Sequence, residues 1–361
     1  MPRPVRASID LTALRHNLAV ARRAAGTAGV LAVVKADAYG HGLKRVLPAL
    51  EAADGLALVE LDKAIWLREG GYRKRLLLLG GFFEASEVAL FARHGLTAVI
   101  HDGEQLRMLE SADVSAPIDV FLKINTGMNR LGFDRVEVEW VIRRHRASGK
   151  LGALTLMTHF ANADDSRGVD WQAAVLDQAG IADGLPRSLA NSAALLRYPA
   201  SRGDWVRPGI MLYGSSPFPE VTAEALALEP VMTLETKVVA QQRLRPGDRV
   251  GYGGTFVASA PMRIGVIACG YGDGYSRHAP SGTPVLIDGR RSSTVGLVSM
   301  DLICVDLTAL PESGVGSRVV LWGPGLSVDE VARASGTVSY ELLCALNRRV
   351  AVVTLDTDSK T

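Results

Sequence analysis

Eight short apolar runs occur between residues 29 and 214, in alternation with longer amphipathic segments. The runs are rich in Leu or β-branched residues and mostly do not alternate with polar residues, which is typical of strands buried on both faces. Segments 61–71 and 85–95 between them end in glycine, a common helix terminator. The runs are 29–35, 55–60, 75–81, 96–101, 117–125, 151–160, 187–192 and 205–214. This α/β rhythm predicts a closed (β/α)8 TIM-type barrel; an open doubly wound sheet is the alternative, which periodicity alone does not exclude.

The rhythm stops near residue 225. Between 231 and 323 apolar and polar residues alternate, and turn signals such as RPGD and DGR separate the segments. This pattern predicts a mainly antiparallel β domain. One late helix is expected in SVDEVARASG, where Ser327 followed by Glu330 fits a capping box. We therefore expect a barrel over residues 10–225 and a C-terminal β domain over 226–361, with residues 1–9 packing against the β domain.

Net charge, apolar-run length and cysteine spacing exclude several classes of protein from the expectation. Forty basic and 38 acidic residues give a net charge of +2, with no basic stripe interleaved with aromatics, so we expect no nucleic-acid partner. No apolar run reaches the roughly 18 residues of a membrane span, and MPRPVRASIDL has no apolar signal segment. Cys269, Cys304 and Cys344 have spacings that suit neither zinc nor a disulfide framework. A cytoplasmic protein without a metal is expected.

In a barrel of this kind the active site lies at the C-terminal ends of the strands. Lys35 closes the first apolar run, where lost hydration lowers the pKa of the amine and exposes the nucleophile that Schiff-base chemistry requires. The alternative is a lysine that extends into solvent. The other strand-end residues are Lys123, Arg130, His159, Asn191, Ser192 and Arg207.

This set is basic and hydroxylic. It lacks the carboxylate pair of a glycosidase and the His and carboxylate cluster of a metal site. A cationic pocket suits an anionic ligand. The turns YGHG (39–42) and RPGI (207–210) could hold a phosphate on their backbone amides.

The segment AVVKADAYGHG (32–42) closely resembles the pyridoxal-phosphate attachment segment of alanine racemases. Further similar segments occur in the family's order over nearly the full chain: LKINTGMNRLGF (122–133), MTHFANAD (157–164), ANSAA (190–194), VRPGIMLYG (206–214), VGYGGTF (250–256), GYGDGYSR (270–277), VSMDLICVD (298–306) and YELLCAL (340–346). The resemblance implies a barrel plus β domain, and a homodimer whose active sites each combine one barrel with the partner's β domain. It also implies racemisation of L-alanine and D-alanine through a pyridoxal 5'-phosphate aldimine.

The resemblance assigns roles to individual positions. Lys35 and Tyr252, the latter from the other subunit, match the two opposed bases, and Arg207 matches the residue facing the pyridine nitrogen, with His159 beside it. The remaining cofactor positions are Tyr39, Asn191, Ser192, Gly209, Ile210 and Tyr340. The substrate-carboxylate positions are Arg130, Met300 and Asp301, and the entrance positions are Tyr271, Asp164 and Arg277. Lys123 matches a lysine that is often carbamylated. Asn125, where many relatives carry Asp, departs from the pattern outside the catalytic set.

Three other functions stay open. A pyridoxal-phosphate decarboxylase of similar architecture is less favoured, because Tyr252 and the short chain suit a racemase. A non-catalytic pyridoxal-phosphate-binding protein is disfavoured by the predicted β domain. A racemase of broader specificity is not excluded, and the sequence does not distinguish cell-wall supply of D-alanine from its breakdown.

Overall fold

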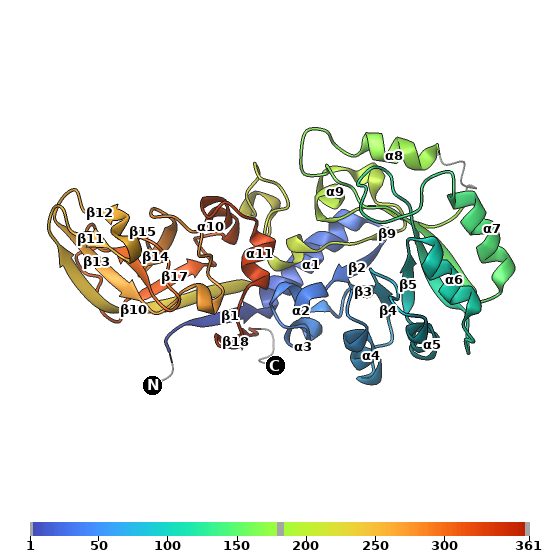
Figure 1. The fold of residues 1–361 in the computed structure, drawn as a ribbon, viewed down its shortest axis with the longest axis horizontal. Helices are drawn as coiled ribbons and strands as arrows, with labels where there is room; N and C mark the ends of the chain where they lie inside the picture. Colours follow the sequence, from blue (N-terminus) through green and yellow to red (C-terminus); the bar gives the residue numbers. More distant parts are fainter. Residues whose placement is uncertain (1–2, 179–183, 358–361) are drawn as a thin grey trace.

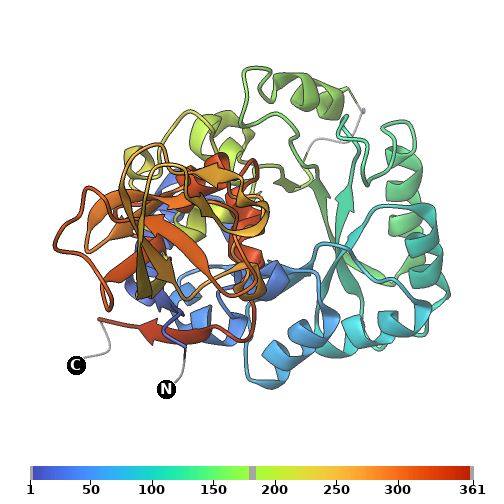
Figure 2. The same ribbon diagram turned by 60° about the vertical axis from the view of Figure 1, so that its left-hand side comes forward.

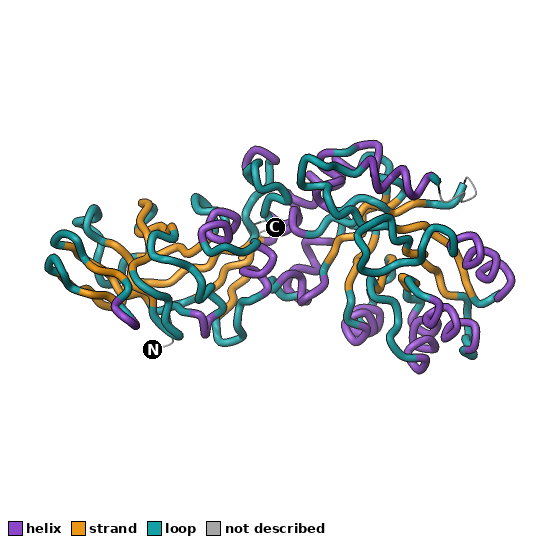
Figure 3. Tube along the Cα trace, turned by 45° about the horizontal axis from the view of Figure 1, so that its top comes forward, coloured by secondary structure: helices purple, strands orange, loops and turns teal. Residues whose placement is uncertain are grey.

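The structure is a computed structural model that describes residues 3–178 and 184–357. The molecule is elongated, with a helix-surrounded sheet at one end and a second, mostly β, body at the other (Figure 1). Figure 3 shows that helices gather around the first body, whereas strands dominate the second. The fold class predicted from the sequence, a barrel followed by a mainly antiparallel β domain, is confirmed.

The first body is the barrel. Eight strands pair in parallel in the order β8-β7-β6-β5-β4-β3-β2-β9. Their bounds are β2 (Gly29–Val33), β3 (Gly55–Leu58), β4 (Arg75–Leu78), β5 (Thr97–Ile100), β6 (Ile118–Lys123), β7 (Leu151–Met157), β8 (Arg187–Ser188) and β9 (Trp205–Val206). A β-bridge between Ser188 and Gly203 brings the two ends of the sheet together. Beside it, Asp204 N–H donates to the Arg187 carbonyl at 2.7 Å. The open doubly wound sheet is therefore excluded.

Helices cover the outside of the barrel (Figure 2). They are α1 (Leu11–Ala25), α4 (Leu61–Glu69), α5 (Ala85–His94), α6 (Gly103–Ser111), α7 (Val138–Ser148), α8 (Asp170–Asp177) and α9 (Ser192–Arg197). α5 ends at Gly95, whose φ of 57° is the left-handed conformation that only glycine adopts without strain. α4 likewise ends at Gly70, so the two predicted helix ends are confirmed.

The last two barrel strands are shorter than the apolar runs that predicted them. The run 205–214 is a strand only over Trp205–Val206 and then forms a 3-10 helix, η3 (Ile210–Tyr213). Pro208 has no N–H to donate to a ladder, which ends the strand early. In the run 187–192 only two residues are strand, and Asn191 instead caps α9 by accepting from Ala194 N–H at 3.0 Å.

The second body is one sheet in the order β13-β16-β15-β14-β17-β10-β1-β18, closed by a further pairing of β13 with β10. Its strands are β1 (Arg6–Asp10), β10 (Met232–Leu244), β13 (Met262–Ile267), β14 (Pro284–Ile287), β15 (Arg290–Val295), β16 (Ile303–Asp306), β17 (Arg318–Trp322) and β18 (Ala351–Leu355). β10 is long enough to pair with β1, β17 and β13, and register shifts after Leu234 and Val238 bend it between them. A small hairpin, β11 (Arg249–Val250) and β12 (Phe256–Val257), projects from this sheet.

Two short helices lie between the sheet and the barrel. α10 (Val328–Ala334) begins as predicted, with Ser327 Oγ accepting from Glu330 N–H at 3.1 Å. The Glu330 carboxylate binds Arg291 instead of returning to the cap, so the expected box is only half formed. α11 (Ser339–Cys344), which the sequence analysis did not predict, packs beside the segment after β2 (Figure 1). Within the described residues no helix has the length and apolar character needed to cross a membrane.

Candidate active site

A cavity of about 740 Å³ opens at the C-terminal ends of the barrel strands. Its size falls within the range of small-molecule sites. Residues from nearly every barrel strand line it, as the strand-end argument predicts. Twelve of the predicted residues line this cavity: Lys35, Tyr39, Lys123, Arg130, His159, Asp164, Asn191, Ser192, Arg207, Gly209, Ile210 and Tyr340.

A left-handed turn positions Lys35 and Tyr39. Residues 36–39, in the segment labelled α2 (Lys35–Tyr39), all have φ between 52° and 56°, although none is glycine. Each such residue costs about 1–2 kcal/mol, so the surrounding structure must hold the turn. Asp37 Oδ1 accepts from Leu43 N–H at 2.8 Å, and the Tyr39 ring stacks on Tyr213 at a centroid distance of 4.8 Å.

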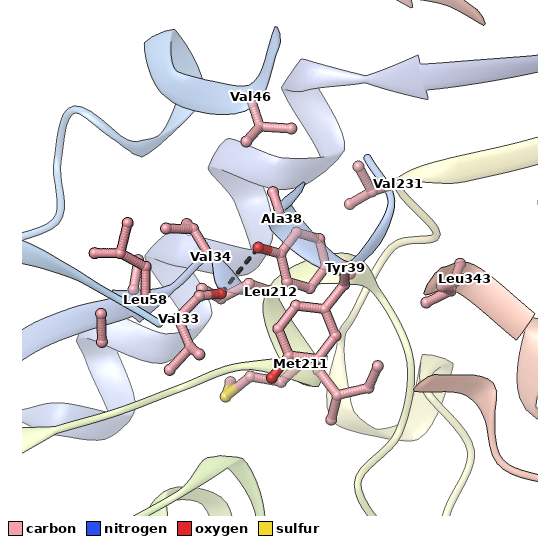
Figure 4. Close-up of a cluster of buried hydrophobic side chains, with 14 of the residues drawn as sticks. Val33, Val34, Ala38, Tyr39, Val46, Leu58, Met211, Leu212, Val231 and Leu343 are labelled. Atoms are coloured by element: carbon pink, nitrogen blue, oxygen red, sulfur yellow. Dashed lines mark hydrogen bonds between the residues drawn. The ribbon is translucent and has the colours of Figure 1, made fainter. Parts of the chain in front are cut away.

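A buried apolar cluster supports the turn from below (Figure 4). Val33 ends β2 and Val34 follows it, Met211 and Leu212 come from η3, and Leu343 comes from α11. The Tyr213 hydroxyl donates to the Val33 carbonyl at 2.9 Å, which joins η3 to the end of β2. The strained turn is therefore fixed by the strand that precedes it and by packing from η3 and α11, two segments that are distant in sequence.

Gly40 allows α11 to approach this turn. Its φ is +78°, and a Cβ there would lie 2.1 Å from the Leu343 carbonyl oxygen. The close approach brings Tyr340 to the cavity, with its ring centroid 5.9 Å from that of Tyr39. Burial raises the pKa of Tyr340 to about 12 and raises that of Tyr39 further still. Both hydroxyls therefore stay protonated at neutral pH and can donate hydrogen bonds.

Hydroxyl and backbone donors meet at the same corner of the cavity. Ser192 Oγ accepts from Gly209 N–H at 2.8 Å. A Cβ on Gly209 would lie 2.6 Å from the Tyr39 hydroxyl oxygen, so a side chain there would fill the corner. Ile210 begins η3, and the first N–H groups of a helix have no hydrogen-bond acceptor within that helix. This corner is suited to a small anion.

Arg207 is a fully buried cation in the cavity wall. Its guanidinium donates to the carbonyl oxygens of Ser188, Thr158 and Leu189 at 2.7, 2.7 and 3.3 Å, and to the Ser188 hydroxyl at 2.6 Å. These acceptors are neutral. Burial lowers the pKa of Arg207 to about 10, which leaves the guanidinium charged at neutral pH.

Other titratable groups around Arg207 respond to its charge and to burial. Burial, followed by the charges of Arg207 and Arg130, lowers the pKa of Lys123 to about 8. Burial and then Arg207 lower the pKa of His159 well below its usual value, so its imidazole is neutral. Burial and then Arg130 lower the pKa of Lys35. The cavity wall therefore combines fixed positive charge with amines that lose protons more easily than in water.

A tight turn after β6 carries Arg130. Asn125 Oδ1 accepts from the N–H groups of Gly127 and Asn129 at 3.1 and 3.0 Å, and Asn129 has a φ of 53°. These bonds fix the backbone that leads into Arg130, whose side chain lies exposed over the cavity. An amide oxygen is sufficient for this role, which explains how Asn can occupy position 125.

Five predicted site residues lie outside the cavity of their own chain. They are Tyr252, Tyr271, Arg277, Met300 and Asp301, all on the β domain. Tyr252 is 74% exposed and follows β11, a strand that lies near the end of the molecule farthest from the barrel (Figure 1). The 271 and 300 segments lie together, because Gly272 N–H donates to the Met300 carbonyl at 2.9 Å.

The fully buried carboxylate of Asp273 anchors these two segments. It binds Arg3 at 2.6 Å and Arg349 at 2.8 Å, one arginine from near each end of the chain. Arg349 also donates to Asp301 Oδ1 at 2.7 Å and to the Met300 carbonyl at 3.2 Å. The exposed face formed by Tyr271, Met300 and Asp301 is thus rigidly supported from behind.

Two polar residues at strand ends were missed by the sequence analysis. His101 closes the run 96–101, lines the cavity and lies 3.2 Å from Asp102. Glu60 closes the run 55–60, and its carboxylate accepts from Ala36 N–H at 3.0 Å. Both positions satisfy the same strand-end criterion that selected Lys35, so the criterion could have found them.

The chain matches two family models. "Alanine racemase, N-terminal domain" matches residues 9–217, and "Alanine racemase, C-terminal domain" matches residues 231–354. An alanine racemase of Nitrosomonas eutropha is 54% identical over 360 residues, covering 98% of this chain and 100% of the relative. A catabolic alanine racemase of Klebsiella aerogenes is 51% identical over 356 residues, covering 98% and 100%.

Solved structures give the same result. The biosynthetic alanine racemase of Pseudomonas aeruginosa superimposes with a TM-score of 0.95 at 46% identity, covering 98% of this chain and 99% of that one. The alanine racemase of Bartonella henselae, described with covalently bound pyridoxal phosphate, gives a TM-score of 0.88 at 26% identity, covering 98% and 100%. The chain therefore belongs to the alanine racemase family of isomerases.

Proposed function

We propose that the chain interconverts L-alanine and D-alanine with pyridoxal 5'-phosphate bound covalently to Lys35. The observation that carries this proposal is the position of the Lys35 amine, at the mouth of a cationic barrel cavity that lowers its pKa. A lowered pKa makes more of the neutral amine available for attack on an aldehyde. The Bartonella relative, described with the cofactor covalently bound, supports the same chemistry.

The donors at one corner of the cavity fit a phosphate. Tyr39, Tyr340 and Ser192 offer hydroxyl groups there, and Gly209 and Ile210 offer main-chain positions with no bulky group in the way. The missing Cβ of Gly209 leaves space that any other residue would fill. The donor set thus matches a tetrahedral anion, which is the phosphate end of the cofactor.

Arg207 fits the nitrogen of the cofactor ring. A guanidinium has donors only and stays protonated, so it would donate to the ring nitrogen and keep that nitrogen free of a proton. Neutral His159 lies in the same wall. When bound, the cofactor supplies an electron sink for the α-carbon of an amino acid, and an Arg at its nitrogen would weaken that sink and limit side reactions.

Two bases on opposite faces of the substrate would move the α-proton. Lys35 would remove the α-proton of D-alanine and would return a proton to the same face of the α-carbon. Tyr252 of a second copy would serve the L-alanine face, because in its own chain Tyr252 is exposed and far from the cavity. Arg130 would bind the substrate carboxylate together with Met300 and Asp301 of the same second copy. Tyr271, Asp164 and Arg277 would line the entrance.

The arrangement of exposed residues favours a homodimer with shared sites. Met300 is 52% exposed, and Leu302 and Leu297 beside it are 45% and 40% exposed. Tyr252 and Tyr271 lie on the same domain. Exposed apolar side chains gathered around polar site residues are typical of an interface. A symmetric dimer would place two such faces on two barrel mouths.

We also propose that Lys123 is carbamylated. With a pKa of about 8, a sizeable share of its amine is neutral at physiological pH. The neutral nitrogen would form a bond to carbon dioxide and release its proton to solvent, and the resulting anion would be stabilised by Arg130 and Arg207. Carbon-13 NMR of the folded chain in ¹³C-bicarbonate should show a carbamate signal, which a Lys123→Arg variant should lack. An unmodified wild-type chain under these conditions would refute the proposal.

The function is tested by incubating the purified chain and cofactor with a panel of L-amino acids. We expect L-alanine to yield D-alanine on chiral chromatography, and borohydride reduction to fix the cofactor on the peptide that carries Lys35. Racemisation of other amino acids would assign a broader specificity. Release of carbon dioxide without a D-amino acid would assign a decarboxylase, and no turnover of any amino acid would leave a binding protein.

A further inference from the structure

Glu60 lies where β3 passes into α4, next to the strand that carries Lys35. It occupies the N-cap position of α4, yet its side chain makes no capping hydrogen bond to that helix. Its carboxylate instead turns toward the end of β2, where Oε1 accepts from Ala36 N–H at 3.0 Å. Oε2 accepts from Val59 N–H at 3.2 Å. The carboxylate therefore binds the residue that follows Lys35 and does not cap α4.

Ala36 is the first residue of the left-handed turn, with φ 53° and ψ 50°. An L-alanine in this conformation is strained by about 1–2 kcal/mol. A hydrogen bond from a backbone N–H to a carboxylate is stronger than one to a neutral acceptor. Glu60 thus holds the strained turn at its start, as Asp37 does at its end by accepting from Leu43 N–H.

The charge of Glu60 also acts on Lys35. Around the lysine amine, burial and Arg130 lower the pKa, whereas Cys344 and Glu60 raise it. Burial raises the pKa of the Cys344 thiol, so the thiol is protonated at neutral pH and the negative charge comes from Glu60. Lys123 and His159 also interact electrostatically with Lys35. The groups that face Lys35 are therefore Arg130, Lys123, His159, Cys344 and Glu60.

We propose that Glu60 is a positioning residue for Lys35, which fixes the backbone of its turn and supplies the carboxylate that balances the positive wall of the cavity. This inference rests on the proposed function of Lys35 as cofactor lysine and base. A base must accept a proton and later return it. Arg130 and Lys123 alone would make protonated Lys35 unfavourable, and the negative charge of Glu60 offsets them.

The charge is tested with Glu60→Gln, which keeps an amide oxygen for Ala36 N–H but removes the negative charge. The measurement is acetic anhydride labelling of Lys35 against pH, read by mass spectrometry on the full chain freed of cofactor. Without the carboxylate the ammonium is less stable, so the labelling midpoint should move to lower pH. Glu69→Gln, an exposed carboxylate at the other end of α4, is the matched control and should not move it. Coincident midpoints for Glu60→Gln and wild type would overturn the electrostatic role.

The backbone role is tested by hydrogen exchange at the Ala36 amide. Glu60→Ala should raise its exchange rate about tenfold through loss of the bond, and Glu60→Gln should raise it less. An Ala36 amide that exchanges at the wild-type rate in Glu60→Ala would overturn this role. If Glu60→Ala unfolds, Glu60→Asp, which withdraws the carboxylate by one methylene, replaces it with the same expected direction.

Neither measurement requires turnover. If the chain failed to racemise alanine while the labelling midpoint moved as expected, the proposed function would fall and the effect of Glu60 on Lys35 would stand. If alanine were racemised and neither the midpoint nor the exchange rate responded, only the inference about Glu60 would fall. Racemisation of alanine by the wild type, with a pH profile that shifts in Glu60→Gln, would support both.

Discussion

Tyr252 shows how a residue can be unremarkable in its own chain and essential in the proposed site. It is a largely exposed phenol beside a glycine-rich hairpin. A phenol with an ordinary pKa of about 10 is a poor base at neutral pH. In the proposed dimer, Tyr252 would act as a base only when the second copy brings it to the barrel mouth that Lys35 and Arg130 line.

Replacing Tyr252 with Phe should remove one base and leave the other. Turnover of L-alanine should fall by about 10²–10⁴-fold, the usual contribution of a general base. In deuterated water, D-alanine should still exchange its α-proton, because Lys35 serves that face, and its configuration should be kept. The measurement combines chiral chromatography with proton NMR.

The control for Tyr252→Phe is Tyr72→Phe, which removes a buried hydroxyl that has no partner among the described residues, away from the cavity. It should retain normal turnover. Both variants should keep the cofactor absorption band. Racemisation at the wild-type rate by Tyr252→Phe would remove this tyrosine from the mechanism.

We expect the side chain of His41 to make the stability of the folded chain sensitive to acid. It is completely buried, its Nδ1 donates to the carbonyls of Ala38 and Tyr39, and burial lowers its pKa from 6.5 to about 4. The unfolded chain therefore takes up a proton at His41 below pH 6.5, whereas the folded chain does so only near pH 4. Stability should be fully present above pH 6.5 and should decrease by roughly 3 kcal/mol as the pH falls toward 4.

Denaturant unfolding between pH 4 and 7 checks this expectation. His41→Gln keeps a donor for the two carbonyls and removes the titration, so its stability should depend less steeply on pH than that of the wild type. The exposed His278, replaced by Gln, is the control and should leave the slope unchanged. Equal slopes for His41→Gln and the wild type would show that His41 is not the source of acid sensitivity.

At the level of elements, Gly40 joins α11 to the barrel. In Gly40→Ala the new Cβ would collide with the Leu343 carbonyl, and the positive φ adds strain. We expect a loss of roughly 2–3 kcal/mol of stability. We also expect weaker cofactor binding, because displacement of α11 withdraws Tyr340 from the phosphate corner. Thermal unfolding and a cofactor titration measure the two effects.

Gly95→Ala is the matched control for Gly40→Ala. Gly95 also has a left-handed backbone, with φ +57°, but nothing lies within 4 Å of the added Cβ. This substitution should cost only about 1 kcal/mol from backbone strain. Cofactor affinity should be unchanged. Equal losses of cofactor affinity in the two variants would show that contact with α11 is not the cause.

The elements that the sequence predicted well have a long or repeated signal. Buried strands and glycine-terminated helices could be predicted because each depends on its own residues. α11 was missed because its six residues are too few for a periodic pattern. The left-handed turn at 36–39 could not be predicted, since Ala-Asp-Ala-Tyr favours no such conformation and packing from η3 and α11 imposes it.

The same distinction applies to the candidate site. Lys35, Lys123, His159 and Arg207 could be found as polar residues that close apolar runs. Tyr340 reaches the cavity only because Gly40 admits α11. The contact of Gly40 with Leu343 joins residues 303 positions apart (343 minus 40), which no local pattern encodes. It could be predicted only through the resemblance to alanine racemases. Tyr252 and Met300 do not line the cavity of their own chain, so even the fold of one chain does not assign them to it.

At the scale of the whole molecule, each chain holds two incomplete halves of the proposed site. The barrel supplies Lys35 and the cofactor cavity, and the β domain supplies Tyr252 and Met300 at a distance from it. Arg3 and Arg349 bind Asp273 behind the second half, so the two termini of the chain stabilise the face that a partner would meet. In the proposed dimer, this rigid face would dock on the barrel of the second copy.

Mixing two inactive variants tests this arrangement. Lys35→Ala lacks the cofactor lysine and Tyr252→Phe lacks the opposite base, so neither homodimer should racemise alanine. In a mixed dimer with shared sites, one site carries both substitutions and the other carries neither. Random reassortment gives about half mixed dimers, each with one intact site of two, so activity should recover to about one quarter of wild type. The measurement is D-alanine formation after the two variants are unfolded and refolded together, with each refolded alone as the control. If both bases instead came from one chain, every site in the mixture would lack a base and no activity would return.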